Sequence, residues 1–588
     1  MKVRIKKKKN PSFKLIDFEI YNDKIYNEET EKEEYQFMIQ MFGMNELGEN
    51  ASIFINDFKP FFYLKVSNKI KKNTERAKEE ILNFIKKTHK TKWYEKEEKR
   101  RTNYKKYYFQ PNIRDCKLVK RKDLYGFDNN KDYYFLYLSF NTLNDYNQIK
   151  RLWTNNNDDD EDTSYKKKKH NKKGEIVIDG KDSDGISIMK HEKLKIYEAA
   201  IPPFLRYFHM RNINPAGWIT FINKVALSKN KKTNCKYEYT TSYKNIRPQH
   251  DKELAVPMKT CSFDIEASSS HGDFPLAKKT YEKLTGEIVA FWISHKNIEN
   301  LEYSEKTNLF VDLFNNAFGF SNTYKYDISP IYPKKEITET KLSKLLNKFI
   351  SKEKIIDILD DEQIKPEDKK KLIDELIIPR DKNGKKETDK QKYKFPDIEG
   401  DTVTFIGSTF KKITDDNIYL NHMVVLNSCD DVPEVPNRVI ESYDTEEELL
   451  LGWTKMIQRE DPNIIIGYNT FGFDWSFMID RADELGIKEE FLNLSKNLNE
   501  ECKVVKSTTT VASGTYEDVY AKIPGRIQID LLNYFRKEVN LDSYKLDFVA
   551  SHFISDKVSD YNVVDDISVI NSKNLTGLES GHFVSFQI

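Results

Sequence analysis

A short apolar run that leads through a polar turn into a helix constrains the fold of this chain more than any other feature. The run spans residues 464–466, and the turn spans residues 468–473. From Asp474 onward, apolar residues recur at helical spacing up to Leu485, and Gly486 follows as a stop signal. A buried strand that runs into a helix is typical of a parallel α/β sheet, in which ligands bind beyond the carboxyl ends of the strands. Asp474 would then face a cleft, although an ordinary helix N-cap would equally place an aspartate there.

A second stretch, upstream of the first, carries two carboxylates on one predicted strand. Residues 262–267 read Ser-Phe-Asp-Ile-Glu-Ala and follow an apolar lead-in. Because side chains alternate along a strand, Asp264 and Glu266 should leave one face while Phe263 and Ile265 enter the core. Two carboxylates held this close repel each other unless a cation lies between them, and Mg²⁺ or Mn²⁺ prefers oxygen ligands. The alternative interpretation is an edge strand with two solvated acids.

The two stretches together narrow the chemistry further. An Asp-x-Glu pair on one strand, followed later by Asn469 and then Phe473-Asp474 at a strand-to-helix junction, is the pattern of exonucleases built around four acidic residues. Such sites hydrolyse phosphodiesters with two metal ions, which lower the pKa of the attacking water and stabilise the attacking and leaving oxygens. The sequence therefore predicts a two-metal site with Asp264, Glu266 and Asp474 as its ligands.

Composition sets limits on the rest of the molecule. Lys and Arg number 96 against 94 Asp and Glu, a formal charge of +2, so any nucleic-acid contact must be local. Of the 588 residues 38% are hydrophobic and 32% are charged, and we expect folded domains interrupted by solvated insertions. The five scattered cysteines form no Cys-x-x-Cys pair and fit a reducing compartment. We find no secretory signal and no long apolar run, and therefore expect a soluble intracellular protein.

The N-terminal region has the pattern of a small α+β module. Alternating residues predict strands at 35–43, 51–55, 57–66 and 133–140, with a helix from 74 to 88. Residues 155–183 combine an acidic block with a lysine block, which is typical of a charged, disordered loop, and a basic finger that contacts DNA is the alternative. A helix that starts at Pro202-Pro203 and a strand near Trp218 then lead into residues 225–252, which we interpret as a polar linker.

The region between the two carboxylate stretches contains a second charged interval. Residues 334–396 are rich in Lys, Asp and Glu, with two short amphipathic helices on either side of Pro366. Since no spacing typical of catalysis occurs there, we interpret this interval as a charged insertion. Strands resume at 401–410 and 422–426, and a helix is expected at 446–457.

Several of these stretches resemble one known family. Ser262-Phe263-Asp264-Ile265-Glu266 resembles the first exonuclease motif of family B DNA polymerases, in their delta-like branch. Residues 461–469 with Phe473-Asp474 are similar to the second motif. The resemblance extends to flanking stretches at 443–450, 525–532 and 543–547, and near the N-terminus at 57–63, 202–203 and 217–219. The charged insertions and the Lys-, Asn- and Ile-rich usage resemble the giant DNA-virus members of that family.

The resemblance implies an α/β and α+β multidomain fold. Residues 1–255 would form the mixed α+β polymerase N-terminal domain, with the charged loop at about 155–183. Residues 256–588 would form an RNase H-like (DEDD) 3′–5′ exonuclease domain, incomplete at its C-terminus and carrying the insertion at about 334–396. The implied activity is that of a 3′–5′ exodeoxyribonuclease that proofreads during DNA replication as part of a DNA-directed DNA polymerase. It would hydrolyse the 3′-terminal phosphodiester of DNA.

The resemblance also assigns roles to individual residues. Asp264 would bridge two Mg²⁺ (or Mn²⁺) ions, and Glu266 would bind the ion that holds the nucleophilic water. Asp474 would anchor the second ion, directly or through water. Asn469 would hydrogen-bond the frayed 3′ strand of DNA, and Phe473 would contribute to the DNA site chiefly by packing beneath it. Asp530 lies in a matched stretch, and we interpret its role as structural, at a strand end.

The fourth acid of the family does not appear where the resemblance requires it. It belongs to a Tyr-x-x-x-Asp helix, and although Tyr561 to Asp565 fits the letters, it arrives early and β-branched residues follow. We therefore interpret it as a chance match. The sequence also contains neither D-x-x-S-L-Y-P-S nor Y-G-D-T-D-S, the motifs that carry the polymerase carboxylates. We expect an N-terminal portion of such a polymerase: a split-gene product, a piece interrupted by an intein or intron, or a truncated sequence.

The implied partners follow from the same resemblance. They are template–primer DNA with a single-stranded 3′ end and a C-terminal polypeptide that carries the palm, with a sliding clamp as a further candidate and no membrane. The protein would act in the nucleus or in a viral replication compartment of the host cytoplasm. The alternative hypothesis is a non-catalytic fragment that binds template and assembles with a partner. A free-standing exonuclease fits less well, because a polymerase-type N-terminal domain would serve no evident purpose there.

Overall fold

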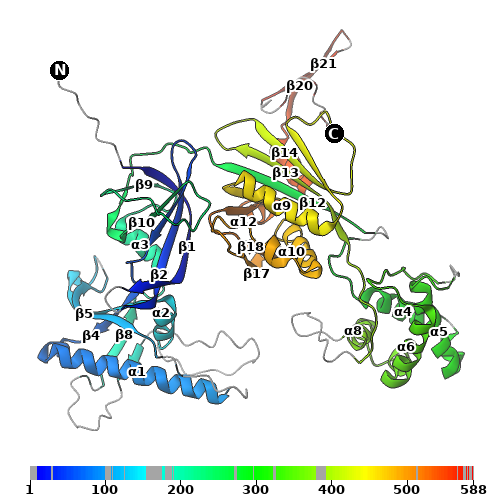
Figure 1. Ribbon diagram of the computed structural model, residues 1–588, viewed down its shortest axis with the longest axis horizontal. Coiled ribbons are helices and arrows are strands. Elements are labelled where there is room, and N and C mark those ends of the chain that lie inside the picture. The colour runs from blue at the N-terminus through cyan, green and yellow to red at the C-terminus, as the bar shows by residue number, and fades with distance from the viewer. Residues whose placement is uncertain are drawn as a thin grey trace.

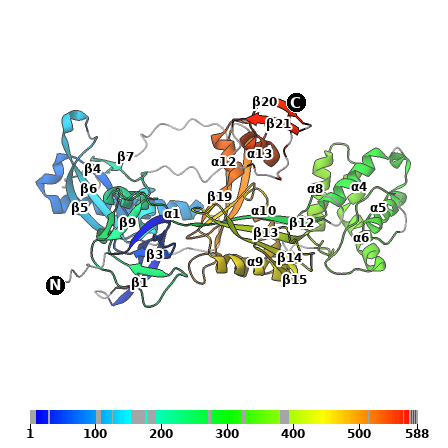
Figure 2. The same ribbon diagram turned by 90° about the horizontal axis from the view of Figure 1, so that it is seen from above.

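The computed structural model describes the chain from Asn10 to Lys573, together with residues 578, 581, 584 and 586. Within that span it leaves out residues 28–30, 100–107, 109, 125, 154–174, 179–188, 190, 270–273, 296, 322–325, 379–391, 512–513 and 566. The charged loop expected at 155–183 lies outside the described residues, apart from 175–178. Figure 2 shows two sheets at one end of the molecule, a third sheet in the middle and a group of helices at the other end.

The first sheet is built mainly from a long hairpin near the N-terminus. Its six strands run in the order β10-β3-β2-β1-β9-β11. They are β1 (Ser12–Asn27), β2 (Lys32–Met44), β3 (Asn50–Ile55), β9 (Trp218–Phe221), β10 (Tyr237–Thr240) and β11 (Ile246–Pro248), and α3 (Pro203–Arg211) packs against them with proline at its first position. The strands expected at 35–43 and 51–55 are confirmed as β2 and β3.

The interpretation of residues 225–252 as a linker is wrong. That segment contains β10, which pairs parallel with β3, and β11, which pairs antiparallel with β9. These strands are held by backbone hydrogen bonds to the two edges of the sheet. Because backbone bonds form with any side chain, such strands need no alternating apolar pattern in their sequence. A polar composition therefore concealed two edge strands.

The second sheet has helices on one face. Its strands run in the order β5-β6-β4-β8-β7. They are β4 (Phe61–Val66), β5 (Ile113–Lys122), β6 (Asp132–Phe140), β7 (Glu175–Val177) and β8 (Lys193–Tyr197), with the helices α1 (Thr74–Lys99) and α2 (Leu143–Lys150). The expected helix begins at Thr74 as predicted but continues to Lys99, because its charged second half contains no glycine or proline to stop it.

The third sheet carries both carboxylate stretches. Its strands run in the order β15-β14-β13-β12-β16-β19, and β12 pairs antiparallel with β13 and parallel with β16. They are β12 (Lys259–Ser268), β13 (Thr402–Lys412), β14 (Ile418–Leu426), β15 (Arg438–Tyr443), β16 (Ile464–Gly467) and β19 (Ile527–Asp530). The register sets Cys261 beside Ile465, so the two predicted stretches are neighbours in one sheet.

Helices on this third sheet bury its apolar side chains. They are α9 (Glu446–Glu460), α10 (Asp474–Leu485) and α11 (Lys488–Phe491). The helices α12 (Leu531–Glu538) and α13 (Leu546–Ile554) follow β19, and a hairpin of β17 (Lys503–Val511) and β18 (Gly514–Lys522) extends from the sheet. Phe263 of β12 packs between Trp453 of α9 and Trp475 of α10, with ring centroids 5.2 and 5.5 Å away. Both tryptophans are fully buried, so β12 is held firmly against α9 and α10.

The charged interval between β12 and β13 forms a helical unit. Its α-helices, within the described residues, are α4 (Glu282–Ser294), α5 (Tyr303–Ala317), α6 (Glu339–Glu353), α7 (Ile355–Asp360) and α8 (Pro366–Ile377). They share a core of their own, which includes Phe310, Leu346, Phe349 and Ile373. The helices expected on either side of Pro366 are present, whereas α4 and α5 were not predicted. We refer to residues 274–400 as the helical segment, which lies apart from both N-terminal sheets in Figure 1.

Both ends of the helical segment meet at one buried arginine. Arg481 of α10 donates to both oxygens of Glu446, to the carbonyl oxygen of Ala277 at 3.1 Å and to Glu399 at 3.3 Å. A Cβ on Gly400 would collide with the Ala277 carbonyl, so the two chain ends lie in direct contact. Arg481 thus joins the start and the end of the helical segment to the helix that begins at Asp474.

A second buried ionic group joins the first and third sheets. Asp461 accepts from Lys496 at 2.5 Å and from Arg526 at 2.8 Å, and also from Asn50 and Asn234 of the N-terminal region. Burial alone would raise the pKa of Asp461, but the two cations hold it below its usual value. Asp461 is therefore one of several groups that hold the two parts together, beside the contacts of Asp17 with Gly525 and of Glu19 with Lys522.

Lys496 should make the stability of the protein depend on pH. Burial, together with the charge of Arg526, lowers its pKa from 10.5 to about 8 against the opposing effect of Asp461. Between those two values the unfolded chain binds more protons at this residue than the folded chain, so its contribution to stability rises with pH. We expect urea titrations to show that the unfolding free energy of the wild type, minus that of Lys496→Met, increases from pH 8 to pH 10.5. A difference that stays constant over this range would contradict the assignment.

The last described elements form a hairpin of β20 (Val558–Val564) and β21 (Ile567–Ser572). The interpretation of Tyr561 to Asp565 as a chance match agrees with this structure, because the stretch is a strand and a turn, not a helix. In the described part of the chain, no helix combines the length and the apolar character that a membrane span requires.

Candidate active site

Strand β12 presents its two acids as the sequence predicts. Phe263 and Ile265 are 3% and 5% exposed and enter the core, whereas Asp264 and Glu266 lie on the exposed face. Asp264 lies beside Gly407 of β13, which has no side chain to cover it. A bulge follows directly after Glu266. Both carboxylates are therefore accessible on one face of a rigid strand.

Asp474 lies at the start of helix α10, which packs against β12. It occupies the first turn of α10 and is 3% exposed. Its Oδ1 accepts from the backbone N–H of Ile265 at 3.1 Å, and its carboxyl group hydrogen-bonds to the Asp264 side chain. The structure thus brings Asp264 and Asp474 together from stretches far apart in the sequence.

The pairing of Asp474 with Asp264 has a clear electrostatic consequence. Burial raises the pKa of Asp474 to about 7, and the hydrogen bond and negative charge of Asp264 add to the rise. Two carboxylates in contact disfavour a second negative charge, so the Asp474 carboxyl holds its proton more tightly than an isolated carboxyl would. A divalent cation would replace that proton, since metal ligands must be deprotonated.

The turn between β16 and α10 is shaped by close backbone contacts. A Cβ atom added to Gly467 would collide with Thr470 and would lie 3.1 Å from the Phe263 carbonyl oxygen. Glycine is therefore required where β16 passes β12. Asn469 adopts φ 63°, and its side chain is exposed at the end of the sheet. The Asn469 side chain is therefore accessible to solvent beside the turn.

Asp530 supports the turn and does not join the acid pair. Its Oδ1 accepts from the backbone N–H of Asn469 at 3.0 Å and of Leu532 at 2.9 Å, and its Oδ2 accepts from Phe471 at 2.8 Å. All three bonds order main chain, in agreement with the structural role expected at this strand end.

Phe473 directly precedes Asp474 and belongs to a small aromatic cluster. The centre of its ring lies 5.4 Å from that of Phe477 and 5.4 Å from that of Phe274. Phe274 remains 73% exposed and was not predicted from the sequence. The only signal for it would have been a single large apolar residue in a polar stretch shortly after β12.

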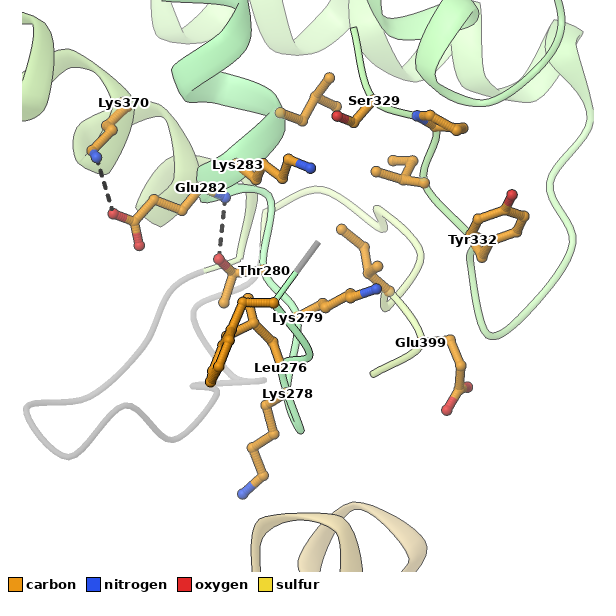
Figure 3. Close-up of a pocket in the computed structure, with 15 residues that line it drawn as sticks. Leu276, Lys278, Lys279, Thr280, Glu282, Lys283, Ser329, Tyr332, Lys370 and Glu399 are labelled. Carbon is orange, nitrogen blue, oxygen red and sulfur yellow. Dashed lines mark hydrogen bonds and ion pairs between the residues drawn. The ribbon is translucent and has the colours of Figure 1, made fainter. Parts of the chain in front are cut away.

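A cavity of about 420 Å³ opens beside Phe274, between the start of α4 and the chain that returns to β13 (Figure 3). Apolar side chains such as Leu284, Ile331 and Ile398 line it, and four lysines surround it. Each of these lysines has a carboxylate partner, as in the pairs of Lys279 with Asp401 and of Lys370 with Glu367. Because its cations are already neutralised, the cavity does not resemble a phosphate site, and the acids on β12 and α10 remain the candidate site.

The donor set can be tested against a metal ion. Within the described residues, no three His, Cys, Asp or Glu side chains are grouped so as to hold a metal. The contact between Asp264 and Asp474 does fit a divalent cation. The pKa of the buried Asp474 is raised beside a second carboxylate, and a cation bound between the two would balance their negative charges. Glu266 lies on the same exposed face but does not complete a three-ligand group.

Comparisons with known proteins identify the family to which this sheet, with its acid pair at a strand-to-helix junction, belongs. A protein-family model described as DNA polymerase family B, exonuclease domain, matches residues 194–359 and 346–549. These ranges span more than half of the chain. The chain therefore belongs to DNA polymerase family B, and it carries the RNase H-like exonuclease domain of that family. The predicted mixed α/β multidomain fold class is confirmed.

Individual relatives agree with this assignment. The chain is 34% identical to the DNA polymerase of Phaeocystis pouchetii virus over 98% of its own length and 58% of that protein. It is 29% identical to the DNA polymerase of Pyramimonas orientalis virus, over 99% of the chain and 44% of that protein. It is 31% identical to the DNA polymerase delta catalytic subunit of Candida albicans, over 29% of the chain and 17% of that protein. The chain thus spans about half the length of the viral relatives, and the expected delta-like and viral resemblance is confirmed.

A structure of the family B DNA polymerase from the archaeon Pyrobaculum calidifontis aligns with 92% of this chain and 39% of that one. The sequence identity is 12% and the TM-score is 0.41.

Proposed function

We propose that the protein removes nucleotides from the 3′ end of DNA, as the 3′–5′ proofreading exonuclease of a replicative family B DNA polymerase. The observation that carries this proposal is the contact between Asp264 and Asp474, which supplies paired carboxylates where an exonuclease of this family needs them. Two bound Mg²⁺ or Mn²⁺ ions would activate the attacking water and stabilise the leaving oxygen.

Each candidate residue would have its own role in the hydrolysis. Asp264 and Asp474 would hold the cations, and the raised pKa of Asp474 means that it gives up its proton as a cation binds. Glu266, exposed on the same face, would hold the ion beside the attacking water. The exposed Asn469 amide would hydrogen-bond the 3′ strand, and Phe473, packed on Phe274, would form the wall beneath the terminal nucleotide.

The domain division and the partners belong to the same proposal. Residues 1–255 would be the polymerase N-terminal domain and residues 256–588 the exonuclease domain, with Asp461 among the residues that join them. A polypeptide that carries the palm would complete the enzyme on template–primer DNA. The apolar side chains Leu546, Phe553, Tyr561, Val563 and Ile567, each more than half exposed on α13 and the β20–β21 hairpin, support such a contact. The site of action would be the nucleus or a viral replication compartment, and a sliding clamp remains a candidate partner.

The direct test is the direction and the metal dependence of DNA hydrolysis. We expect a single-stranded oligodeoxynucleotide labelled at its 5′ end to be shortened stepwise from its 3′ end in Mg²⁺ or Mn²⁺ and to remain intact in EDTA. The protein alone should be slow and should gain activity when a palm-bearing polypeptide is added. Release of the 5′ label as mononucleotide would contradict the proposal.

A second candidate function is a non-catalytic fragment that binds template and assembles with a partner. The observation that favours it is the absence of a three-ligand metal group in the described part of the chain. Under this alternative, the protein would retain the labelled oligonucleotide in a binding assay and leave it uncut in either metal, with the partner present. The same pair of measurements therefore separates the two functions.

A further inference from the structure

Helix α6 of the helical segment carries a row of lysines on its outward side, in the group of helices at one end of the molecule (Figure 2). The side chains of Lys341, Lys344, Lys348 and Lys352 are all exposed and recur every three or four residues. Side chains at this spacing lie above one another on one side of a helix. The opposite side of α6 packs into the core through Leu342, Leu346, Phe349 and Ile350. The four lysines, which we call the lysine row, therefore face away from the core.

The lysine row has no acidic partner in the part of the chain that the structure describes. Between Glu339 at its start and Glu353 at its end, α6 contains no acid, and Glu353 is already paired with Lys392 at 3.2 Å. The ion pairs of the helical segment join other lysines, as in the pair of Lys370 with Glu367. Four positive charges on one side of a helix are thus left without a negative charge of the fold to balance them.

This arrangement is unfavourable for the helix by itself. Like charges four residues apart repel each other, as Lys348 does with both Lys344 and Lys352. Lys341 lies in the first turn, where the helix dipole favours negative charge. On α1, by contrast, Arg76 pairs with Glu80 one turn away. An anion bound from outside would remove the repulsion along α6.

A second segment widens the basic surface. The chain that returns toward β13 passes α6, and its Tyr393 and Phe395 rings lie 5.1 and 5.3 Å from the ring of Phe349. Both rings are buried, whereas Lys394 between them is exposed. Lys394 therefore points away from the core beside α6 and adds a fifth cation to this surface.

The length of the lysine row fits a nucleic-acid backbone. An α-helix rises about 1.5 Å per residue, so the row extends over roughly 16 Å from Lys341 to Lys352. One strand of B-DNA advances about 3.4 Å per phosphate, so this length corresponds to about five phosphates. Asn347 and Ser351 are exposed on the same helix and are side chains of the kind that hydrogen-bond phosphate oxygens.

We propose that the lysine row of α6 binds the phosphate backbone of duplex DNA, at a place separate from the candidate exonuclease site. Lysine acts on phosphate as a compact point charge, so this contact would not depend on base sequence. Duplex DNA is the ligand that we assign, because the chain belongs to a DNA polymerase family and the surface is complementary to DNA in charge.

Other polyanions fit this surface less well. Sites for single strands combine cations with aromatic rings on which bases stack, and the outward side of α6 has no aromatic residue. A helix that lies on a membrane inserts apolar side chains beside its cations, whereas Leu346 and Phe349 of α6 are buried in the core. The row therefore offers charge alone, which is what a regular phosphate backbone requires.

The test measures the binding of a short fluorescein-labelled DNA duplex to the full chain by anisotropy, in EDTA so that no hydrolysis occurs, over a range of salt concentrations. The variant replaces Lys344, Lys348 and Lys352 with glutamine, which favours helices as well as lysine does. The slope of log K against log salt should become less steep by about 2.7, because each contact of a cation with B-DNA contributes about 0.9. Arginine at the same three positions keeps the charge and should keep the slope.

The matched control removes the same charge from the same segment. Lys335, Lys365 and Lys371 are exposed lysines of the helical segment that lie outside α6. Their replacement by glutamine should leave the slope close to that of the wild type. This control separates the position of the lysine row from the net charge of the protein.

Three results would overturn the proposal. The first is a wild-type salt slope for the α6 glutamine variant with an unchanged melting temperature, and the second is an equal loss of slope in the control. The third is a larger loss of affinity for labelled oligoglutamate or oligodeoxythymidine than for the duplex, which would assign the row to an acidic protein or to single strands. Because the assay needs no cleavage, its result does not depend on the proposed exonuclease activity.

Discussion

Replacing Asp264 with alanine should lower the rate of 3′-terminal hydrolysis by about a thousandfold or more. Asp264 is the carboxylate that contacts Asp474, so its loss leaves a single buried acid with no partner to share a cation. Metal stabilisation of a transition state amounts to several kcal/mol, and each 1.36 kcal/mol corresponds to a factor of about ten in rate. The measurement is the initial rate of nucleotide release in Mg²⁺, with the palm-bearing polypeptide present.

A neighbouring residue supplies the control for this experiment. Ser262 lies on the same exposed face of β12, two residues before Asp264, so Ser262→Ala changes the strand without removing a carboxylate. We expect Ser262→Ala to retain most of the activity. The assignment of the site would be wrong if Asp264→Ala released nucleotides at a rate close to that of Ser262→Ala.

Replacing Arg481 with methionine should destabilise the protein by about 3–5 kcal/mol. Arg481 is 1% exposed and donates to Glu446, which is 7% exposed and also accepts from the backbone N–H of Val403. Removing the arginine alone leaves Glu446 buried without its cation. Urea titrations of the full chain would measure the loss as a lower unfolding midpoint.

A second variant separates lost charge pairing from lost packing. Arg481→Met combined with Glu446→Gln removes the unpaired charge, and should recover a large part of the stability. If the double variant is no more stable than Arg481→Met, the ionic pairing is not what holds α9, α10 and the helical segment together.

The parts that the sequence predicted well are those in which a local pattern decides the structure. Alternation along β12 follows from the pleat of a single strand, and the run from β16 into α10 follows from apolar spacing and the glycine at residue 486. Asp264, Glu266 and Asp474 could be chosen as candidates for this reason. Their roles as metal ligands, and those of Asn469 and Phe473 in DNA binding, remain predictions.

The parts that the sequence did not predict depend on contacts between distant segments. Phe274 becomes notable only because the fold sets it against Phe473, and Arg481 only because it meets Ala277 and Glu399. Similarly, β10 is polar and short, and only the edge of β3 makes it a strand. The helices α4 and α5 were missed because the interval after β12 was interpreted by its charge. Their apolar residues become a core only when α6 and α8 supply the opposite faces.

The way the helical segment is attached has a consequence for how the chain tolerates change. The backbone N–H of Asp401 donates to the carbonyl oxygen of Leu276 at 2.9 Å, and the backbone N–H of Leu276 donates to the Asp401 carboxylate at 2.8 Å. The chain therefore leaves and re-enters the third sheet at adjoining points, much as it would in a tight turn between β12 and β13. Beyond that junction, Lys334 still pairs with Glu484 of α10, and Phe274 packs on Phe473. Insertions at such a junction are tolerated where these contacts are kept, so changes in the length of the rest of the helical segment should leave Asp264 beside Asp474.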